Sequence, residues 1–297
     1  MLDNQIRLAA FEHLKDLVSI YGDVLPYKEL IKGFLFKGER ITLLGASGIW
    51  KPKQLDLPIS ITTSSSGPYS DSLTNDGFLK YKYRGTDPNH RDNKGLRELI
   101  NLQKPLIYFH SVLEGKYMAT WPVYIMNDNI NALEFTVAVD DAYHISDAIG
   151  KAEDPEEHYR RKYLTSSVLV RLHQKSFRER VLAAYQNHCT LCNLRHVELL
   201  DAAHIIGDNE DTGEPIIQNG LALCKIHHAA FDQNILGISP DYTIKIRHDI
   251  LQETDGPMLK YGIQLLDNNS LILPKDIRNY PDKDRLSTRF EQFLKAG

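Results

Sequence analysis

All three cysteines of this 297-residue chain fall between positions 189 and 224. They form Cys189-x-x-Cys192 and, together with a histidine, Cys224-x-x-His227. Two such pairs, each on a tight turn, can direct three thiolates and one imidazole at a single ion, which suits a closed structural Zn²⁺ site. The alternatives are thiols that serve as small buried hydrophobic groups, or one disulfide with a thiol left over. The ligand spacing favours structural zinc.

A second set of polar residues lies between and beside these pairs. It consists of His204 in Asp201-Ala-Ala-His204-Ile, Asn219 in Asn219-Gly-Leu-Ala-Leu-Cys, and His228, directly after the last zinc ligand. Hydrolysis of a phosphodiester needs a deprotonated water and neutralisation of charge on the phosphate, and one histidine and one divalent ion can divide this work. Two other histidines flank the first cysteine pair, and we expect both at the surface: His188 and His196.

The run from Cys189 to Asp232 resembles the HNH endonuclease motif in its zinc-stapled ββα-metal form, as found in bacterial restriction-type nucleases. The match extends over about 55 residues, judged by motif spacing. The resemblance implies that His204 is the general base that activates water and that Asn219 orients the backbone around it. It also implies that His228 holds a catalytic Mg²⁺ or Mn²⁺ against the scissile phosphate.

One position departs from this pattern. Many members of the family carry a metal-ligating Asp or His directly before the base, whereas this chain has Ala203. Two carboxylates are candidate replacements. Asp232 follows His228 by one helical turn, and Asp201 shares a strand face with position 203. We expect Asp232 to be the ligand, with Asp201 as the second candidate.

The first half of the chain is predicted to be rich in β-structure. Strand-like runs with β-branched and aromatic residues occur at 59–63, 79–83, 106–109 and 121–125, and one helix interrupts them at about 93–103. An amphipathic helix over about 3–21 precedes them. This order favours a small mixed barrel crossed by a helix, and therefore an α+β chain, over an alternating parallel sheet.

Within this half, Tyr83-Arg84-Gly85, Asn93-x-x-Leu96, Pro105-Leu-Ile-Tyr and Tyr117 before Trp121-Pro-Val-Tyr-Ile resemble SRA-type, PUA-like domains that read modified bases in duplex DNA. The resemblance spans about 90 residues through short, spaced signatures. It implies that a nucleotide is flipped into a pocket and stacked on an aromatic side chain. The residues that we consider for this pocket are Tyr69, Asp71, Tyr81, Tyr83, Arg84 and Trp50.

We expect an SRA/PUA-like DNA-reading domain over 1–150, a helical linker over 151–180 and an HNH endonuclease domain over 181–297. The linker is predicted to contain a helix from about 156 to 174 and a second helix that begins at Ser176, where Ser176-x-x-Glu179 has the capping-box pattern. A final helix is expected over about 284–295. Because one nuclease site cuts one strand, double-strand cutting predicts a homodimer.

Composition restricts the function classes only mildly. The formal net charge of −4 argues against a protein that coats DNA through bulk charge. No apolar run is long enough to span a membrane, and no signal peptide is recognisable, so we expect a cytoplasmic protein with reduced thiols.

The sequence thus predicts a Zn²⁺-containing, Mg²⁺- or Mn²⁺-dependent endonuclease that hydrolyses phosphodiester bonds in double-stranded DNA. We expect a modification-dependent restriction enzyme that recognises 5-methylcytosine, 5-hydroxymethylcytosine or a similar base. Two alternatives stay open. The first domain can read another feature, such as a phosphorothioate backbone, unmodified sequence, RNA or a protein. The chain can also be a DNA-binding protein whose nuclease is weak or inactive.

Overall fold

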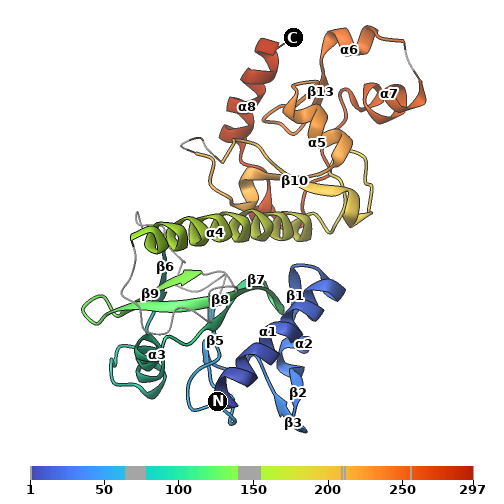
Figure 1. Ribbon diagram of the computed structural model, residues 1–297. Helices are drawn as coiled ribbons and strands as arrows, with labels where there is room; N and C mark the ends of the chain where they lie inside the picture. Colours follow the sequence, from blue (N-terminus) through green and yellow to red (C-terminus); the bar gives the residue numbers. More distant parts are fainter. Residues whose placement is uncertain are drawn as a thin grey trace. The chain divides into compact units, whose positions relative to one another are not determined.

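The computed structural model describes residues 2–63, 78–139, 155–208, 210, 212–254 and 256–296 (Figure 1). Two of the residues considered for base binding, Tyr69 and Asp71, lie outside this part of the chain. Contacts divide the chain into two compact units, Met1–Leu172 and His173–Gly297. Both units contain helices and antiparallel strands, so the expected α+β class is confirmed.

The first unit is built on a seven-stranded sheet. Its strands follow the order β4 (Ile49–Trp50), β5 (Ser60–Thr63), β7 (Leu106–Leu113), β8 (Lys116–Asn129), β9 (Glu134–Val139) and β6 (Leu79–Lys82), and β1 (Val24–Pro26) also pairs with β8. Only β5 and β7 run parallel among these pairs. The alternation and β-branched content of these segments account for the sheet.

The sheet curls so that its two edges approach each other. The hydroxyl of Tyr81, on the edge strand β6, donates a hydrogen bond of 2.9 Å to the carbonyl of Gly48, just before the opposite edge strand β4. No ladder joins β4 to β6 among the described residues, so the expected barrel is an open half-barrel.

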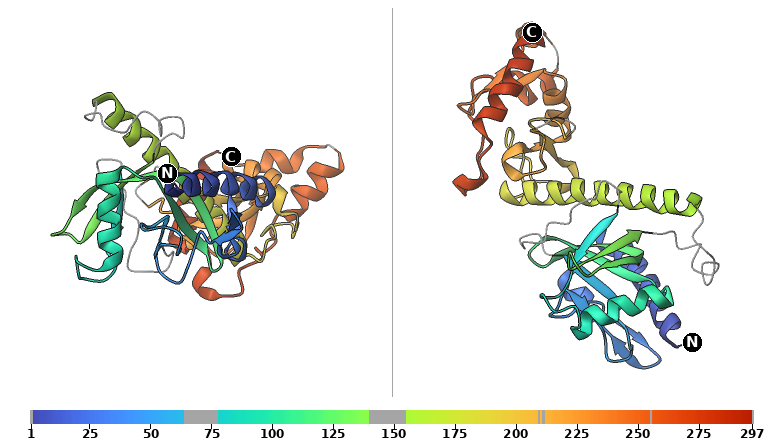
Figure 2. Two further views of the ribbon diagram at one scale, coloured as in Figure 1. Left: turned by 60° about the horizontal axis from the view of Figure 1, so that its bottom comes forward. Right: turned by 90° about the vertical axis from the view of Figure 1, so that its left-hand side faces the viewer.

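Helices cover both faces of this sheet (Figure 2). On one face, the apolar stripe of α1 (Leu2–Tyr21) packs with α2 (Tyr27–Lys32) and the small hairpin β2 (Phe34–Phe36) and β3 (Glu39–Ile41) against Ile107 and Phe109 of β7. On the other face, α3 (Arg91–Leu102) buries Leu96 and Leu99. The helical periodicity of these apolar residues explains why both helices form where the sequence predicts them.

The long helix α4 spans Pro155–Ala184 without a break, which corrects the prediction of two helices. Between these ends the sequence has neither glycine nor proline, so nothing forces the helix to stop. Ser176 is a buried interior residue of α4 and does not cap a helix start. Leu169 and Leu172 belong to the core of the first unit, whereas Phe177 and Val181 belong to the core of the second.

The second unit contains the expected ββα element. Strands β10 (Leu200–His204) and β11 (Gly220–Cys224) pair antiparallel, and α5 (Lys225–Asp232) follows β11 directly. The single turns η2 (Val197–Leu199) and η3 (Ile217–Asn219) precede the two strands. The remaining elements complete the unit: β12 (Leu236–Ile238), β13 (Ile244–Ile246), α6 (His248–Gln252), α7 (Pro257–Gly262), η4 (Gln264–Leu266), η5 (Ile277–Asn279) and α8 (Lys283–Ala296).

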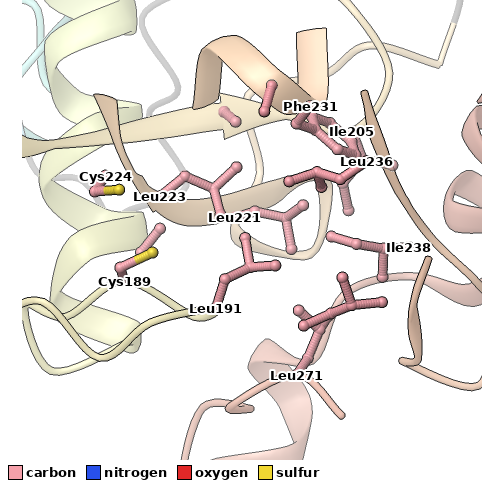
Figure 3. Close-up of a cluster of buried hydrophobic side chains, with 14 of the residues drawn as sticks. Cys189, Leu191, Ile205, Leu221, Leu223, Cys224, Phe231, Leu236, Ile238 and Leu271 are labelled. Carbon is pink, nitrogen blue, oxygen red and sulfur yellow. The ribbon is translucent and has the colours of Figure 1, made fainter. Parts of the chain in front are cut away.

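The core of this unit joins β11 to the residues around it (Figure 3). Leu221 and Leu223 are fully buried and pack with Phe231 of α5 and Leu236 of β12. Cys189 and Cys224 lie side by side at one end of this cluster (Figure 3). The core therefore fixes where the cysteine side chains meet.

Candidate metal centre and nuclease site

The four predicted zinc ligands come together in the structure. Their ligand atoms, from Cys189, Cys192, Cys224 and His227, all lie within 4.8 Å of one another. The first pair forms a turn in which the amide of Asn193 donates to the carbonyl of Cys189 at 2.9 Å. The second pair sits at the junction of β11 and α5, with His227 in the first turn of the helix. Three sulfurs and one imidazole at this separation fit a tetrahedral zinc ion.

The orientation of His227 supports this fit. Its Nδ1 lies 3.4 Å from the sulfur of Cys189 and 3.2 Å from that of Cys224. Its Nε2 donates a hydrogen bond of 2.6 Å to the carbonyl oxygen of Gly262. A hydrogen bond of this kind on the second nitrogen holds a ligating imidazole in the correct tautomer.

The neighbouring sulfurs change the pKa of His227. Burial would lower the pKa of His227, but hydrogen bonds to the sulfurs of Cys189 and Cys224 raise it to about 10. Of the two flanking histidines, His196 is exposed as expected, whereas His188 is buried, which corrects its surface assignment.

His204 and Asn219 lie at the other end of the same hairpin. His204 is the last residue of β10 and pairs with Gly220, the first residue of β11. The fully buried amide of Asn219 accepts a hydrogen bond from the backbone N–H of Ile206 at 2.9 Å and donates to its carbonyl at 3.0 Å. It also donates to the carbonyl of Glu214 at 3.1 Å. Asn219 thus fixes the backbone directly after His204.

The His204 imidazole is partly buried and packs on an aromatic ring. It stacks on Phe177 of α4, with the ring centroids 4.0 Å apart and the planes inclined by 14°. Burial is the largest influence on this imidazole and lowers its pKa below the ordinary value. Asp208 and Asp232 act in the opposite direction, and His228 adds to the lowering. A neutral imidazole is the form that can accept a proton.

Both candidate carboxylates reach His228, but from opposite sides. The Nε2 of His228 lies 3.4 Å from Asp232, and its Nδ1 lies 3.7 Å from Asp201. One ion therefore cannot take the same nitrogen together with both carboxylates. Asp201 is also 3.2 Å from Lys225 and 3.7 Å from Arg178, whereas Asp232 is more exposed, at 54% of its side chain.

The burial of Ala203 explains why no ligand stands there. Its side chain is fully buried in the hydrophobic core of the unit, opposite Leu221 of β11. A carboxylate at this position would lose its hydration. The alanine is therefore consistent with its packing, and the carboxylates on either side of His228 do not depend on it.

The four described residues that the sequence suggested for base binding make contacts within the first unit. Trp50 donates its Nε1–H to the carbonyl of Thr42 at 3.1 Å, and Tyr81 bonds to Gly48 as described above. The buried ring of Tyr83 stacks on Phe135, and its hydroxyl contacts Asp128 and Arg97. The guanidinium of Arg84 pairs with Asp92. Their assignment to base binding stays a prediction.

A cavity of about 210 Å³ lies next to two of these residues, since Tyr81 bonds to Gly48 and Trp50 packs against Gly45 in its lining. The lining residues themselves were not predicted from the sequence to form a site. No lining residue is charged; they are Leu44, Gly45, Ala46, Ser47, Gly48, Thr62, Thr63, Ser111 and Tyr117. The hydroxyl of Thr62 is buried and has no hydrogen-bond partner among the described residues. Tyr117 is the one lining residue that belongs to the SRA-like sequence signature. Most of its neighbours in the cavity come from distant segments of the chain.

Comparisons with known proteins agree with the assignment of the ββα element. Residues 189–239, which include both cysteine pairs, match the HNH endonuclease family model. No curated protein matches the sequence. In the part of the chain that the structure describes, no helix is long and apolar enough to cross a membrane.

Two solved structures show a remote likeness. The modification-dependent TagI restriction endonuclease has 15% identity and a TM-score of 0.29, with 80% of this chain and 81% of that chain covered. The Type IV phosphorothioation-dependent restriction endonuclease ScoMcrA has 16% identity and a TM-score of 0.24, with 62% of this chain and 50% of that chain covered. Likeness at this level does not define what the present chain binds.

Replacement of a cysteine ligand tests the metal centre. We expect Cys192→Ala to reduce bound zinc from about one ion per chain to nearly none and to unfold the second unit, because metal binding here contributes folding free energy. Metal analysis of the purified protein, with circular dichroism melting, measures both effects. His196→Ala is the matched control, since this exposed histidine lies outside the ligand cluster. Full zinc content in Cys192→Ala would contradict the ligand set.

Proposed function

We propose that this protein is a metal-dependent DNA endonuclease and that its first unit selects modified double-stranded DNA. The observation that carries the nuclease proposal is the arrangement at the end of the β10–β11 hairpin. There His204, the backbone-fixing Asn219 and the pair His228 and Asp232 gather on an element that matches the HNH family model. The proposed cellular role is a cytoplasmic restriction enzyme, in a compartment where thiols stay reduced and free to bind zinc.

In this proposal His204 accepts a proton from the attacking water. Burial lowers the pKa of the imidazole and so keeps it in the neutral, proton-accepting form. Asn219 positions the base by holding the backbone of Ile206, and it transfers no proton. A bound Mg²⁺ or Mn²⁺ supplies neutralisation of charge at the scissile phosphate. Zn²⁺ held by the three cysteines and His227 would keep the hairpin and α5 together and would take no part in the reaction.

The Nε2 side of His228 is the proposed position of the catalytic ion. Asp232, on that side, is close enough to influence the pKa of His204, as is His228 itself. Asp201 on the other side is already neutralised by Lys225 and Arg178. Arg289 is close enough for Asp232 to act on its pKa, but among the described residues no lysine or arginine forms an ion pair with the Asp232 carboxylate. A carboxylate without such an ion pair is more available to a cation, which favours Asp232 as the second ligand.

The proposal for the first unit rests on the sequence resemblance and on the cavity. A lining of hydroxyl groups and backbone without charged side chains suits a neutral planar heterocycle with hydrogen-bonding edges, which describes a nucleobase. The unpartnered hydroxyl of Thr62 would gain a partner when such a base enters. The base in question is proposed to be 5-methylcytosine, 5-hydroxymethylcytosine or a similar one, read by an SRA/PUA-like domain.

Cleavage of matched duplexes tests the proposed function. The substrates are identical except that they carry cytosine, 5-methylcytosine, 5-hydroxymethylcytosine or phosphorothioate linkages, and Mn²⁺ is present. We expect cutting of one base-modified duplex, and a loss of at least about a thousandfold in His204→Ala, because the water then has no base. Equal cutting of all duplexes would contradict the proposed selectivity for a modified base. Cutting by His204→Ala would contradict the assignment of His204 as the general base.

Two carboxylate variants test the position of the ion. We expect Asp232→Asn to raise the Mn²⁺ concentration for half-maximal cleavage by about tenfold or more, because a charged oxygen ligand is lost. Asp201→Asn is the matched control on the Nδ1 side of His228 and should change that concentration less. Cleavage rates across a Mn²⁺ titration give the comparison. The opposite order of effects would place the ion on the side of Asp201.

An isosteric substitution tests the cavity. Thr62→Val removes one hydroxyl and keeps the shape of the side chain, so folding should be unchanged or slightly improved, since that hydroxyl has no partner. Affinity for the cleaved duplex should fall by roughly tenfold, the value of one hydrogen bond. Titration in Ca²⁺, which prevents turnover, measures binding, and urea unfolding measures stability. Unchanged affinity would show that the base does not enter this cavity.

A further inference from the structure

A residue outside the HNH match packs directly on the proposed base. Phe177 belongs to α4, ahead of the matched residues 189–239, and only 2% of its surface is exposed. Its ring is nearly parallel to the His204 imidazole, with a centroid separation of 4.0 Å. This is a stacked contact between the faces of the two rings, so it defines the plane in which the imidazole lies.

The opposite strand is adapted to this contact. Gly220 pairs with His204, and a Cβ atom at position 220 would lie 2.4 Å from Cγ2 of Val181 and 2.9 Å from Cζ of Phe177. Both neighbours belong to α4. The missing side chain at Gly220 therefore lets α4 approach the hairpin closely enough for Phe177 to reach the imidazole.

Among the residues that the structure describes, no hydrogen bond orients the His204 imidazole. The Nε2 of His204 is buried and lacks a hydrogen-bond partner among the described residues. Asn219 bonds to the backbone of Ile206 and does not contact the imidazole through the hydrogen bonds described above. A general base is usually oriented by a hydrogen bond from a third group. Here the stacked ring of Phe177 is the group that orients the imidazole.

We propose that Phe177 is a positioning residue for the reaction: its ring sets the plane of the His204 imidazole, and Gly220 provides the space for it. The proposal rests on the proposed function, in which His204 is the general base. Phe177 does not touch the water or the phosphate. Its effect acts through the orientation of His204, and misplacement of a catalytic group by about 1 Å can cost about a hundredfold in rate.

Phe177→Leu tests the proposal, because leucine keeps an apolar side chain but removes the flat ring. We expect the single-turnover cleavage rate at saturating DNA and Mn²⁺ to fall by roughly 10- to 100-fold, with DNA affinity and zinc content unchanged. In the NMR spectrum, the His204 ring protons should lose the upfield shift that a stacked aromatic ring produces. A structural defect alone would not combine an intact zinc content with these two changes.

Phe293→Leu is the matched control. Phe293 is a buried phenylalanine of α8 in the same unit, where it contacts Gly237, so its loss costs comparable packing without altering the His204 stack. Gly220→Ala is the second variant, expected to displace the Phe177 ring and lower the rate in the same way while zinc remains bound. A cleavage rate in Phe177→Leu equal to that of Phe293→Leu, or an unchanged His204 spectrum, would overturn the proposal.

His204→Ala separates the two levels of the hypothesis. If that variant is inactive while Phe177→Leu behaves as Phe293→Leu, the nuclease proposal stands and the positioning role of Phe177 fails. If His204→Ala cleaves as well as the protein without substitutions, the assignment of His204 as general base fails, and the inference about Phe177 fails with it.

Discussion

The convergence of three cysteine sulfurs and one imidazole is the interaction on which the second unit depends. Cys189 and Cys192 come from the turn after α4, whereas Cys224 and His227 come from the end of β11 and the start of α5. Between these segments, the described backbone atoms form one hydrogen bond outside regular elements, from the amide of Thr190 to the carbonyl of Ala222. Because the side chains meet within 4.8 Å, a bound ion would fix the turn, the hairpin and the helix as one piece.

That constraint extends along the five-residue strand β11 to the nuclease residues. Cys224 at one end belongs to the metal cluster, and Gly220 at the other end pairs with His204. The residues between them are fully buried, so the strand transmits a defined geometry and tolerates little slippage. The metal cluster and the proposed catalytic histidine thus lie at opposite ends of one hairpin, so a bound ion would support the site without touching it.

The sequence predicted the parts of this site that are defined by local spacing. The two cysteine pairs, the ββα order and the helical-turn relation between His228 and Asp232 each depend on residues close in the chain. The contact between Phe177 and His204 joins residues that are far apart, and no spacing rule indicates it. The capping pattern at Ser176 predicts a helix start there, whereas the absence of any helix-breaking residue favours the uninterrupted helix α4 that the structure shows. The cavity is likewise not predictable from local spacing, since its lining residues come from four separate stretches of the chain.

The central claim is that one small unit has two metal sites with different tasks, a tight structural zinc and a weaker catalytic ion at His228. The most direct measurement is metal analysis of the purified protein, followed by Mn²⁺ titration monitored by electron paramagnetic resonance. Both are carried out on the protein without substitutions and on His228→Ala. The account predicts about one zinc per chain in both proteins and a Mn²⁺ site only in the unmodified one. Loss of zinc in His228→Ala, or Mn²⁺ binding that persists in it, would contradict the division into two sites.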